Sequence, residues 1–189
     1  MEGDPVTKTG DRIAGQEEMA EAIDRIGSRL AEVLGPPEQV AFIGIHTHGV
    51  SLAQRLKNRF DASFETDTAI GTLDINLYRD DYDLRGVKPR IQSSDIRFSV
   101  DEKELVLVDD VLFTGRTIRA AIEALGDYGR PSAIRLAVLA DRGHRELPIQ
   151  PDAVGLVFET AKQDRIRVRM TEIEGEDEIR LLRGSGTRE

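Results

Sequence analysis

Short runs of apolar residues alternate with helical patterns along this sequence, and this alternation constrains the fold more than any other feature. The apolar runs are "QVAFIGI" at 39–45, "ELVLV" at 104–108 and "AIRLAVLA" at 133–140. Strands buried on both faces of a parallel sheet have this composition. Apolar residues at helical spacing lie at 16–34, 50–60 and 116–128. The alternation predicts an α/β fold, with a mainly parallel twisted sheet flanked by helices on both faces.

Further segments complete the expected domain. Those with strand character are "TAIGTLDINLY" at 68–78, "AVGLVF" at 153–158 and the polar-alternating "IRVRMTEI" at 166–173, which suits an edge strand. A long charged segment at 79–97 interrupts them, and loops of that length in compact domains are often functional. Residues 1–15 and 183–189 are polar with several glycines, so we expect flexible ends around a single domain at 16–182.

The composition limits the class of protein. The chain has 189 residues, which suits one hydrophobic core, and no cysteine, which excludes disulfides and thiolate metal sites. No apolar run approaches the roughly 18 residues of a membrane span, and the first residues lack a signal-peptide pattern, so we expect a cytoplasmic protein with no membrane partner. The formal net charge of −9 disfavours a protein devoted to nucleic-acid binding, because phosphate contacts dominate that affinity.

Two adjacent carboxylates, Asp109 and Asp110, follow the run at 104–108 directly. After them, Thr114, Gly115 and Thr117 stand at the mouth of the next expected helix. Backbone N–H groups at a helix N-terminus, with hydroxyl groups beside them, can bind a phosphate monoester. The carboxylates would then face sugar hydroxyls or Mg²⁺ on the same ligand. The alternative is that the aspartates only start a turn, although a turn needs only one such residue.

Three loops follow strands of the expected sheet. They are "HTHG" at 46–49, "DDVLFTGRT" at 109–117 and "DRGHRE" at 141–146. In open α/β sheets, ligands bind outside the carboxyl ends of the strands. The sequence therefore predicts that these loops lie together and form one ligand site.

Several motifs resemble a known family. "VLVDDVLFTGRT" looks like the signature of the type I phosphoribosyltransferases, which bind phosphoribosyl pyrophosphate (PRPP). "DINLYRDD" (74–81), "LGDYGRPSAIRLAVLADRGHRELPI" (125–149) and "IGIHTHGVSLAQRL" (43–56) make the resemblance more specific. Together they resemble the PyrR family, the bifunctional uracil phosphoribosyltransferases and pyrimidine-operon attenuation regulators, over about residues 16–182.

The resemblance implies roles for particular residues. Asp109 and Asp110 would be catalytic, holding the ribose of PRPP and its Mg²⁺, and Arg79 would reach the pyrophosphate from a mobile hood at about 74–100. The residues implied to bind PRPP or the nucleotide are Thr47, His48 and Gly49 at the pyrophosphate, and Val111, Leu112, Phe113, Thr114, Gly115, Arg116 and Thr117 in the signature, whose end would cradle the 5′-phosphate. Those implied to bind uracil are Leu139, Ala140, Asp141 and Arg142.

The implied reaction joins uracil to the ribose 5-phosphate of PRPP and releases UMP and pyrophosphate. An oxocarbenium-like transition state needs no protein nucleophile. Catalysis would come from positioning, from Mg²⁺ that neutralises the leaving group, and from the exclusion of water by the hood. This explains why the sequence shows no obvious catalytic acid, base or nucleophile.

Two histidines depart from the family pattern. His48 stands where the family usually carries an arginine, and His46 where a basic residue is common. Because an ordinary imidazole is mostly neutral at pH 7, pyrophosphate binding is expected to be weaker or pH-dependent. The histidines could also serve only as hydrogen-bonding groups in a turn, or ligate a metal if a third ligand were near. His144 lies in the loop 141–146, where the alternative to a role in binding is a purely structural one.

The resemblance also implies binding of pyr operon mRNA by a basic face of a homodimer or higher homo-oligomer. The basic or polar candidates in this chain are Arg25, Arg29, Arg145, Thr160, Lys162 and Arg165. Against them stand Leu156 and Glu159, which replace a family lysine and proline, and acidic residues in the first helix and in "TEIEGEDE". RNA recognition needs a basic footprint, so RNA binding stays open.

The sequence therefore leaves four functions open. The first is a uracil phosphoribosyltransferase that also regulates transcription in response to UMP. The second is the enzyme without RNA binding, and the third is a nucleotide-sensing regulator with vestigial catalysis. The fourth, salvage of a purine base, is disfavoured by "LADRGHRELPI".

Overall fold

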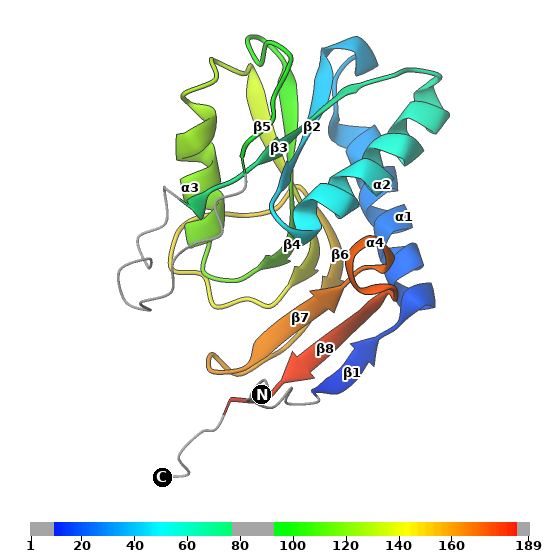
Figure 1. Cartoon of the computed structure of the whole chain (residues 1–189), viewed down its shortest axis with the longest axis vertical. Coiled ribbons are helices and arrows are strands. Elements are labelled where there is room, and N and C mark those ends of the chain that lie inside the picture. The colour runs from blue at the N-terminus through cyan, green and yellow to red at the C-terminus, as the bar shows by residue number, and fades with distance from the viewer. Residues whose placement is uncertain (1–9, 77–92, 185–189) are drawn as a thin grey trace, which may run out of the picture.

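A computed structural model describes residues 10–76 and 93–184 of the chain. Arg79 and most of the expected hood lie outside these residues. Within them, a five-stranded sheet has the order β3-β2-β4-β5-β6, and every neighbouring pair is parallel (Figure 1). Its strands are β2 (Val40–Ile45), β3 (Ala69–Leu73), β4 (Glu104–Leu112), β5 (Ala133–Asp141) and β6 (Ala153–Val157). The predicted α/β fold with a parallel sheet is confirmed.

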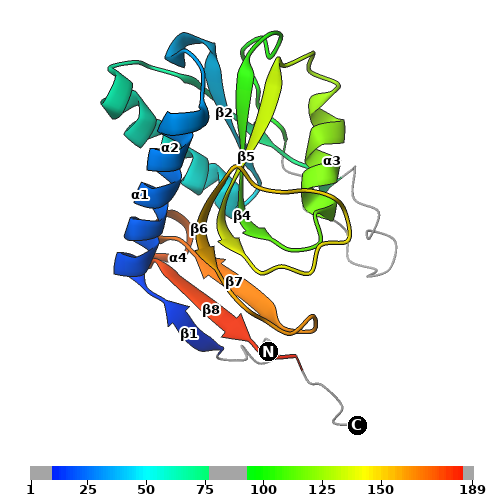
Figure 2. The same cartoon turned by 180° about the vertical axis from the view of Figure 1, so that it is seen from behind.

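Helices cover both faces of this sheet. The helices α1 (Gln16–Val33) and α2 (His48–Phe64) pack on one face, and α3 (Arg116–Leu125) packs on the other (Figures 1 and 2). A one-turn 3-10 helix, η1 (Pro37–Gln39), leads into β2. No helix of the described residues is long and apolar enough to cross a membrane.

Alternating side chains of the central strands build two cores. Phe42 of β2 belongs to the core under α1 and α2, whereas the next residue, Ile43, belongs to the core under α3. Successive strand residues point to opposite faces, so a strand between two helical layers must be apolar at every position. All six residues of β2 are buried for this reason.

A second, antiparallel sheet lies beside the carboxyl ends of β4 and β5 (Figure 1). Its order is β1-β8-β7, with β1 (Asp11–Ala14), β8 (Glu178–Leu182) and β7 (Arg165–Arg169). Residues 11–14 were expected to be flexible, but they pair with β8. The expected strand at 166–173 is correct only as far as Arg169, because the short helix α4 (Thr171–Glu174) follows. As predicted, β7 is an edge strand.

The strand β4 extends further than the sequence indicated. It was expected to end at residue 108, but it pairs with β5 as far as Leu112. Asp109 and Asp110 therefore lie within a strand, and the reading in which they only start a turn is wrong. Asp109 is 5% exposed, and its Oδ1 accepts a hydrogen bond from the N–H of Asp110.

Candidate functional site

The chain between β4 and α3 forms a tight loop at the N-terminus of the helix. Gly115 caps α3 with a φ of 91°, in the left-handed region that glycine adopts most readily. The N–H of Arg116 lies 3.4 Å from the hydroxyl oxygen of Thr114. The first N–H groups of α3 have no partner within the helix, so this loop is suited to an anion.

A cavity of about 590 Å³ opens over this loop. From the signature it is lined by Asp109, Val111, Leu112, Phe113, Thr114, Gly115, Arg116 and Thr117. From other segments it is lined by Arg142, Lys162, Gln163, Asp164 and Arg165. The cavity thus brings most residues of the signature together with Arg142, which was predicted to bind uracil. Lys162 and Arg165, which were predicted to bind RNA, also line it. Gln163 and Asp164 were not anticipated, because no motif marks them.

Arg142 is held by the protein itself. Its guanidinium group donates hydrogen bonds to the carbonyl oxygens of Asp164 at 2.6 Å and Ala161 at 2.9 Å. It also lies 4.0 Å from the centre of the Phe113 ring, a cation–π distance. Burial lowers the pKa of Arg142, and the charge of Asp164 opposes this only in part. Arg142 therefore holds the segment 160–164 next to the loop that follows β4.

The loop after β5 packs against the loop after β4, as predicted. The N–H of Glu146 donates to the carbonyl oxygen of Thr114 at 3.0 Å, and Arg145 donates to the carbonyl oxygen of Phe113 at 2.9 Å. Arg145 also forms an ion pair with Asp141. Leu139 and Ala140 are fully buried within β5, so only their main-chain groups are suited to contact a base.

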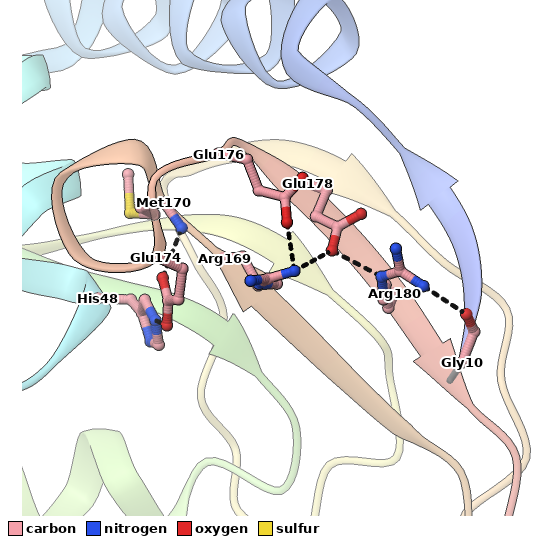
Figure 3. A network of polar contacts seen from close by, with 8 residues as sticks. All are labelled: Gly10, His48, Arg169, Met170, Glu174, Glu176, Glu178 and Arg180. Carbon is pink, nitrogen blue, oxygen red and sulfur yellow. Dashed lines mark hydrogen bonds and ion pairs between the residues drawn. The ribbon is translucent and has the colours of Figure 1, made fainter. Parts of the chain in front are cut away.

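The loop 46–49 packs against β4 at the start of α2. A Cβ atom on Gly49 would lie 2.5 Å from the carbonyl oxygen of Val108, so only glycine fits this contact. Beside it, His48 lies between two carboxylates. Its Nδ1 is 3.6 Å from Oδ2 of Asp110. Its Nε2 is 2.9 Å from Oε1 of Glu174 (Figure 3). Thus the loop 46–49 is joined both to β4 and to α4.

Glu174 was not predicted as a site residue. Its second carboxylate oxygen accepts a hydrogen bond from the N–H of Met170 at 2.9 Å (Figure 3). Burial raises the pKa of Glu174, but the N–H of Met170, the His48 ring and Arg169 together outweigh burial, so the pKa lies below its usual value. In the sequence Glu174 is one of several acidic residues in "TEIEGEDE", and nothing local distinguishes it.

The histidines gain no metal-site partners in the part of the chain that the structure describes. There, no group of three His, Asp or Glu side chains is arranged to hold a metal ion. Among residues 10–76 and 93–184, the buried Nε2 atom of His46 finds no hydrogen-bond partner. In contrast, Nε2 of His144 lies 2.7 Å from the carbonyl oxygen of Thr160. His144 thus helps to fix the segment that Arg142 also holds.

The predicted RNA-binding residues are mostly engaged in contacts of the fold. On α1, Arg25 donates to the carbonyl oxygen of Gly155 at 3.1 Å, and Arg29 forms an ion pair with Glu32 at 2.9 Å. Arg145 contacts the loops of the site as described above. Thr160 accepts a hydrogen bond from Arg142 at 3.2 Å, and Lys162 forms an ion pair with Glu146 at 3.1 Å. Arg165 lines the cavity.

Comparison with known proteins agrees with this geometry. A sequence model of the family described as "Phosphoribosyl transferase domain" matches residues 9–168. A protein named "Bifunctional protein PyrR" from Picosynechococcus sp. is 44% identical over 178 residues, which are 94% of this chain and 100% of the relative. One of the same name from Chloroflexus aurantiacus is 48% identical over 175 residues, 92% of this chain and 96% of the relative.

The fold is shared more widely. The solved structure of a hypoxanthine phosphoribosyltransferase from Trypanosoma cruzi matches with a TM-score of 0.67 and 17% sequence identity, covering 95% of each chain. The parallel sheet, the loop at the start of α3 and the family match define a phosphoribosyltransferase. Within that class, the chain belongs to the PyrR family.

Proposed function

We propose that this protein is a uracil phosphoribosyltransferase, which converts uracil and PRPP to UMP and pyrophosphate, and that it regulates pyrimidine operon transcription by UMP-responsive binding of mRNA. The observation that carries the catalytic half is the cavity in which Asp109 and the loop 113–117 face the same space. The regulatory half is supported by the family and by the printed name of its relatives, "Bifunctional protein PyrR".

The donor would bind along β4 and the start of α3. The 5′-phosphate of PRPP would lie at the loop 113–117, against main-chain N–H groups and the hydroxyls of Thr114 and Thr117. Asp109, at the other end of the cavity wall, would accept hydrogen bonds from ribose hydroxyls. A phosphate at one end and a sugar at the other match the order of groups in a nucleotide.

The pyrophosphate of PRPP would lie at the loop 47–49, beside Asp110. Mg²⁺ commonly binds through one or two carboxylates together with substrate phosphates, and Asp109 and Asp110 offer oxygen ligands of that kind. When bound there, Mg²⁺ would neutralise negative charge on the departing pyrophosphate. Arg79 would add positive charge to the same group.

Uracil would be recognised mainly by main-chain groups of residues 139–142. The guanidinium of Arg142 already donates to carbonyl oxygens of the segment 160–164, so it would act by holding that wall of the cavity. Aligning the base with the ribose carbon would lower the barrier by positioning, and no side chain need attack the substrate.

Turnover of PRPP with uracil, guanine and hypoxanthine tests the catalytic half, with Asp110→Asn as the matched variant. We expect turnover with uracil and a clear loss of it in Asp110→Asn. Unchanged kinetics in the variant would show that this carboxylate takes no part in the mechanism. Faster turnover with hypoxanthine than with uracil would show that the substrate is a purine base.

RNA binding at several salt concentrations, with and without UMP, tests the regulatory half. We expect binding that weakens with salt and responds to UMP. Uracil turnover without RNA binding in low salt would leave an enzyme alone. RNA binding without turnover would leave a regulator with vestigial catalysis. The oligomeric state, which we propose to be a homodimer or a higher homo-oligomer, is measured in the same samples by sedimentation.

A further inference from the structure

The acidic segment "TEIEGEDE" at 171–178 is bound by α2 of the same chain. Arg55 of α2 donates two hydrogen bonds to Glu172, at 2.7 and 2.6 Å. It donates two more to Asp177, at 2.6 and 2.9 Å. Paired contacts between a guanidinium group and a carboxylate are strong and fix the geometry of both groups. The acidic segment is therefore anchored to α2 by a single arginine.

Asp177 joins Arg55 to the first residue of α4. Its side chain is 10% exposed, and its Oδ1 also accepts hydrogen bonds from the N–H of Thr171 at 2.7 Å and from the hydroxyl of Thr171 at 2.9 Å. The hydrogen bond from Arg55 lowers the pKa of Asp177 most strongly, burial opposes it, and the contacts from Thr171 add to the lowering. Asp177 thus stays ionised at neutral pH and holds the start of α4 against Arg55.

The same short helix brings Glu174 to His48. Arg55 and His48 lie about two turns apart on α2, so they share one face of that helix. Oε1 of Glu174 is 2.9 Å from Nε2 of His48 (Figure 3). As described above, the pKa of Glu174 lies below its usual value, so the carboxylate is ionised and can only accept a hydrogen bond. Nε2 of His48 is therefore the donor, and α2 binds the acidic segment at two points.

We propose that Arg55 is a positioning residue for pyrophosphate binding, an inference that rests on the proposed place of the pyrophosphate of PRPP at the loop 46–49. Arg55 holds α4 in place, and Glu174 of α4 holds the side chain of His48 at the start of α2. The first N–H groups of α2, which have no partner within the helix, are the donors that an anion would meet there. A loop that is already in place loses less freedom when its ligand binds.

The alternative is that Arg55 only attaches the small antiparallel sheet to the rest of the fold. The two roles differ in the ligands that they affect. Loss of positioning would weaken only a ligand that contacts the loop 46–49. Loss of attachment would also weaken a ligand at the loop 113–117, because Arg165 of the small sheet lines that cavity.

The test compares two ligands by calorimetry: pyrophosphate with Mg²⁺, and UMP, which carries no pyrophosphate. We expect Arg55→Gln to raise the Kd of pyrophosphate and the KM for PRPP about fivefold, whereas kcat and the Kd of UMP stay within about twofold of the wild type. Arg59→Gln is the matched control, because Arg59 lies one turn further along α2 and forms its ion pair with Asp24 of α1. It should bind both ligands as the wild type does.

A double-mutant cycle tests the route through Glu174. Glu174→Gln removes the charge that contacts His48, so Arg55→Gln should add little to the Kd of pyrophosphate in that background. Additive effects would show that Arg55 acts by another route and would overturn the proposal. Thermal unfolding shows whether each variant is folded. Arg55→Lys, which keeps the charge but not the paired contacts, is the second variant and should give a smaller increase in the same Kd.

The remaining outcomes separate this inference from the proposed function. Equal losses of pyrophosphate and UMP binding in Arg55→Gln would show that Arg55 only attaches the small sheet. Unchanged pyrophosphate binding would show that it has no positioning role. If the wild type binds pyrophosphate but does not convert uracil, the proposed catalysis fails, and the binding comparison still decides the role of Arg55. If the wild type binds no pyrophosphate, the place assigned to it is wrong and this inference fails too.

Discussion

Glu178→Gln removes the buried carboxylate between Arg169 and Arg180. Glu178 is only 4% exposed, and two guanidinium groups compensate its buried charge. The hydrogen bond from Arg180 lowers the pKa of Glu178 most strongly, burial opposes it, and Arg169 adds to the lowering, so that the pKa falls from 4.5 to about 2. Replacing the carboxylate should therefore destabilise the small sheet.

The size of the effect follows from the pKa. One pKa unit corresponds to about 1.4 kcal/mol, so the full shift would correspond to about 3 kcal/mol. The side chains of Arg169 and Arg180 are 31% and 28% exposed, and solvent screens part of that interaction. We therefore expect Glu178→Gln to lower the free energy of unfolding by about 2 kcal/mol at pH 7.

The pH dependence gives the sign of the effect. Since the pKa of Glu178 is depressed in the folded state, its contribution is fully present above the unfolded value of 4.5 and is lost as pH falls toward about 2. The difference in unfolding free energy between wild type and Glu178→Gln should thus be constant from pH 7 to pH 5 and shrink below that. Taking the difference cancels the other carboxylates, which titrate in both proteins.

Urea denaturation of both proteins at about pH 7, 5 and 3 measures this difference. Glu176→Gln is the matched control, because Glu176 also contacts Arg169 but is 53% exposed, and it should cost less than about 0.5 kcal/mol. A loss in Glu178→Gln as small as in the control, or one that persists unchanged at the lowest pH, would refute the reasoning.

Two further predictions concern the loop 46–49. Gly49→Ala should lower the free energy of unfolding by about 1–3 kcal/mol in thermal or urea denaturation, because the added Cβ meets the carbonyl oxygen of Val108 at 2.5 Å; a variant as stable as the wild type would contradict this. Glu174→Gln should raise the KM for PRPP more than it lowers kcat, because the variant loses the charge that orients His48. A lower kcat at unchanged KM would show that Glu174 does not act through pyrophosphate binding.

The large sheet was predictable because its signals are local. An apolar run such as that of β2 is readable within a few residues, and the helical spacing of α1 is equally plain. The small sheet was missed in part because β1 and β8 are short and carry charged residues. Only their pairing, between residues such as Arg12 and Arg180, makes them strands, and no short window of sequence contains that pairing.

In the candidate site, too, the features with local sequence signals were predicted and those that depend on distant segments were not. The loop at Gly115 was found because its turn chemistry and the following helix are adjacent in sequence. Glu174 and Gln163 were missed because they come from segments distant in sequence from the motifs: Glu174 ends the helix α4, between β7 and β8, and Gln163 lies in the loop before β7. The place of Arg142 was foreseen, but its contacts with Ala161 and Asp164 depend on how that loop folds.

The pairing of β1 with β8 has a consequence for synthesis of the protein on the ribosome. Nearly the whole chain separates these strands, so at about 5–20 residues per second β1 waits on the order of ten seconds for its partner. By then β2 to β6 are already available to form the large sheet, with Asp109 and Asp110 in place. His48 meets Glu174 only at the end of translation, so the nascent protein acquires the loop 113–117 first and its small antiparallel sheet last.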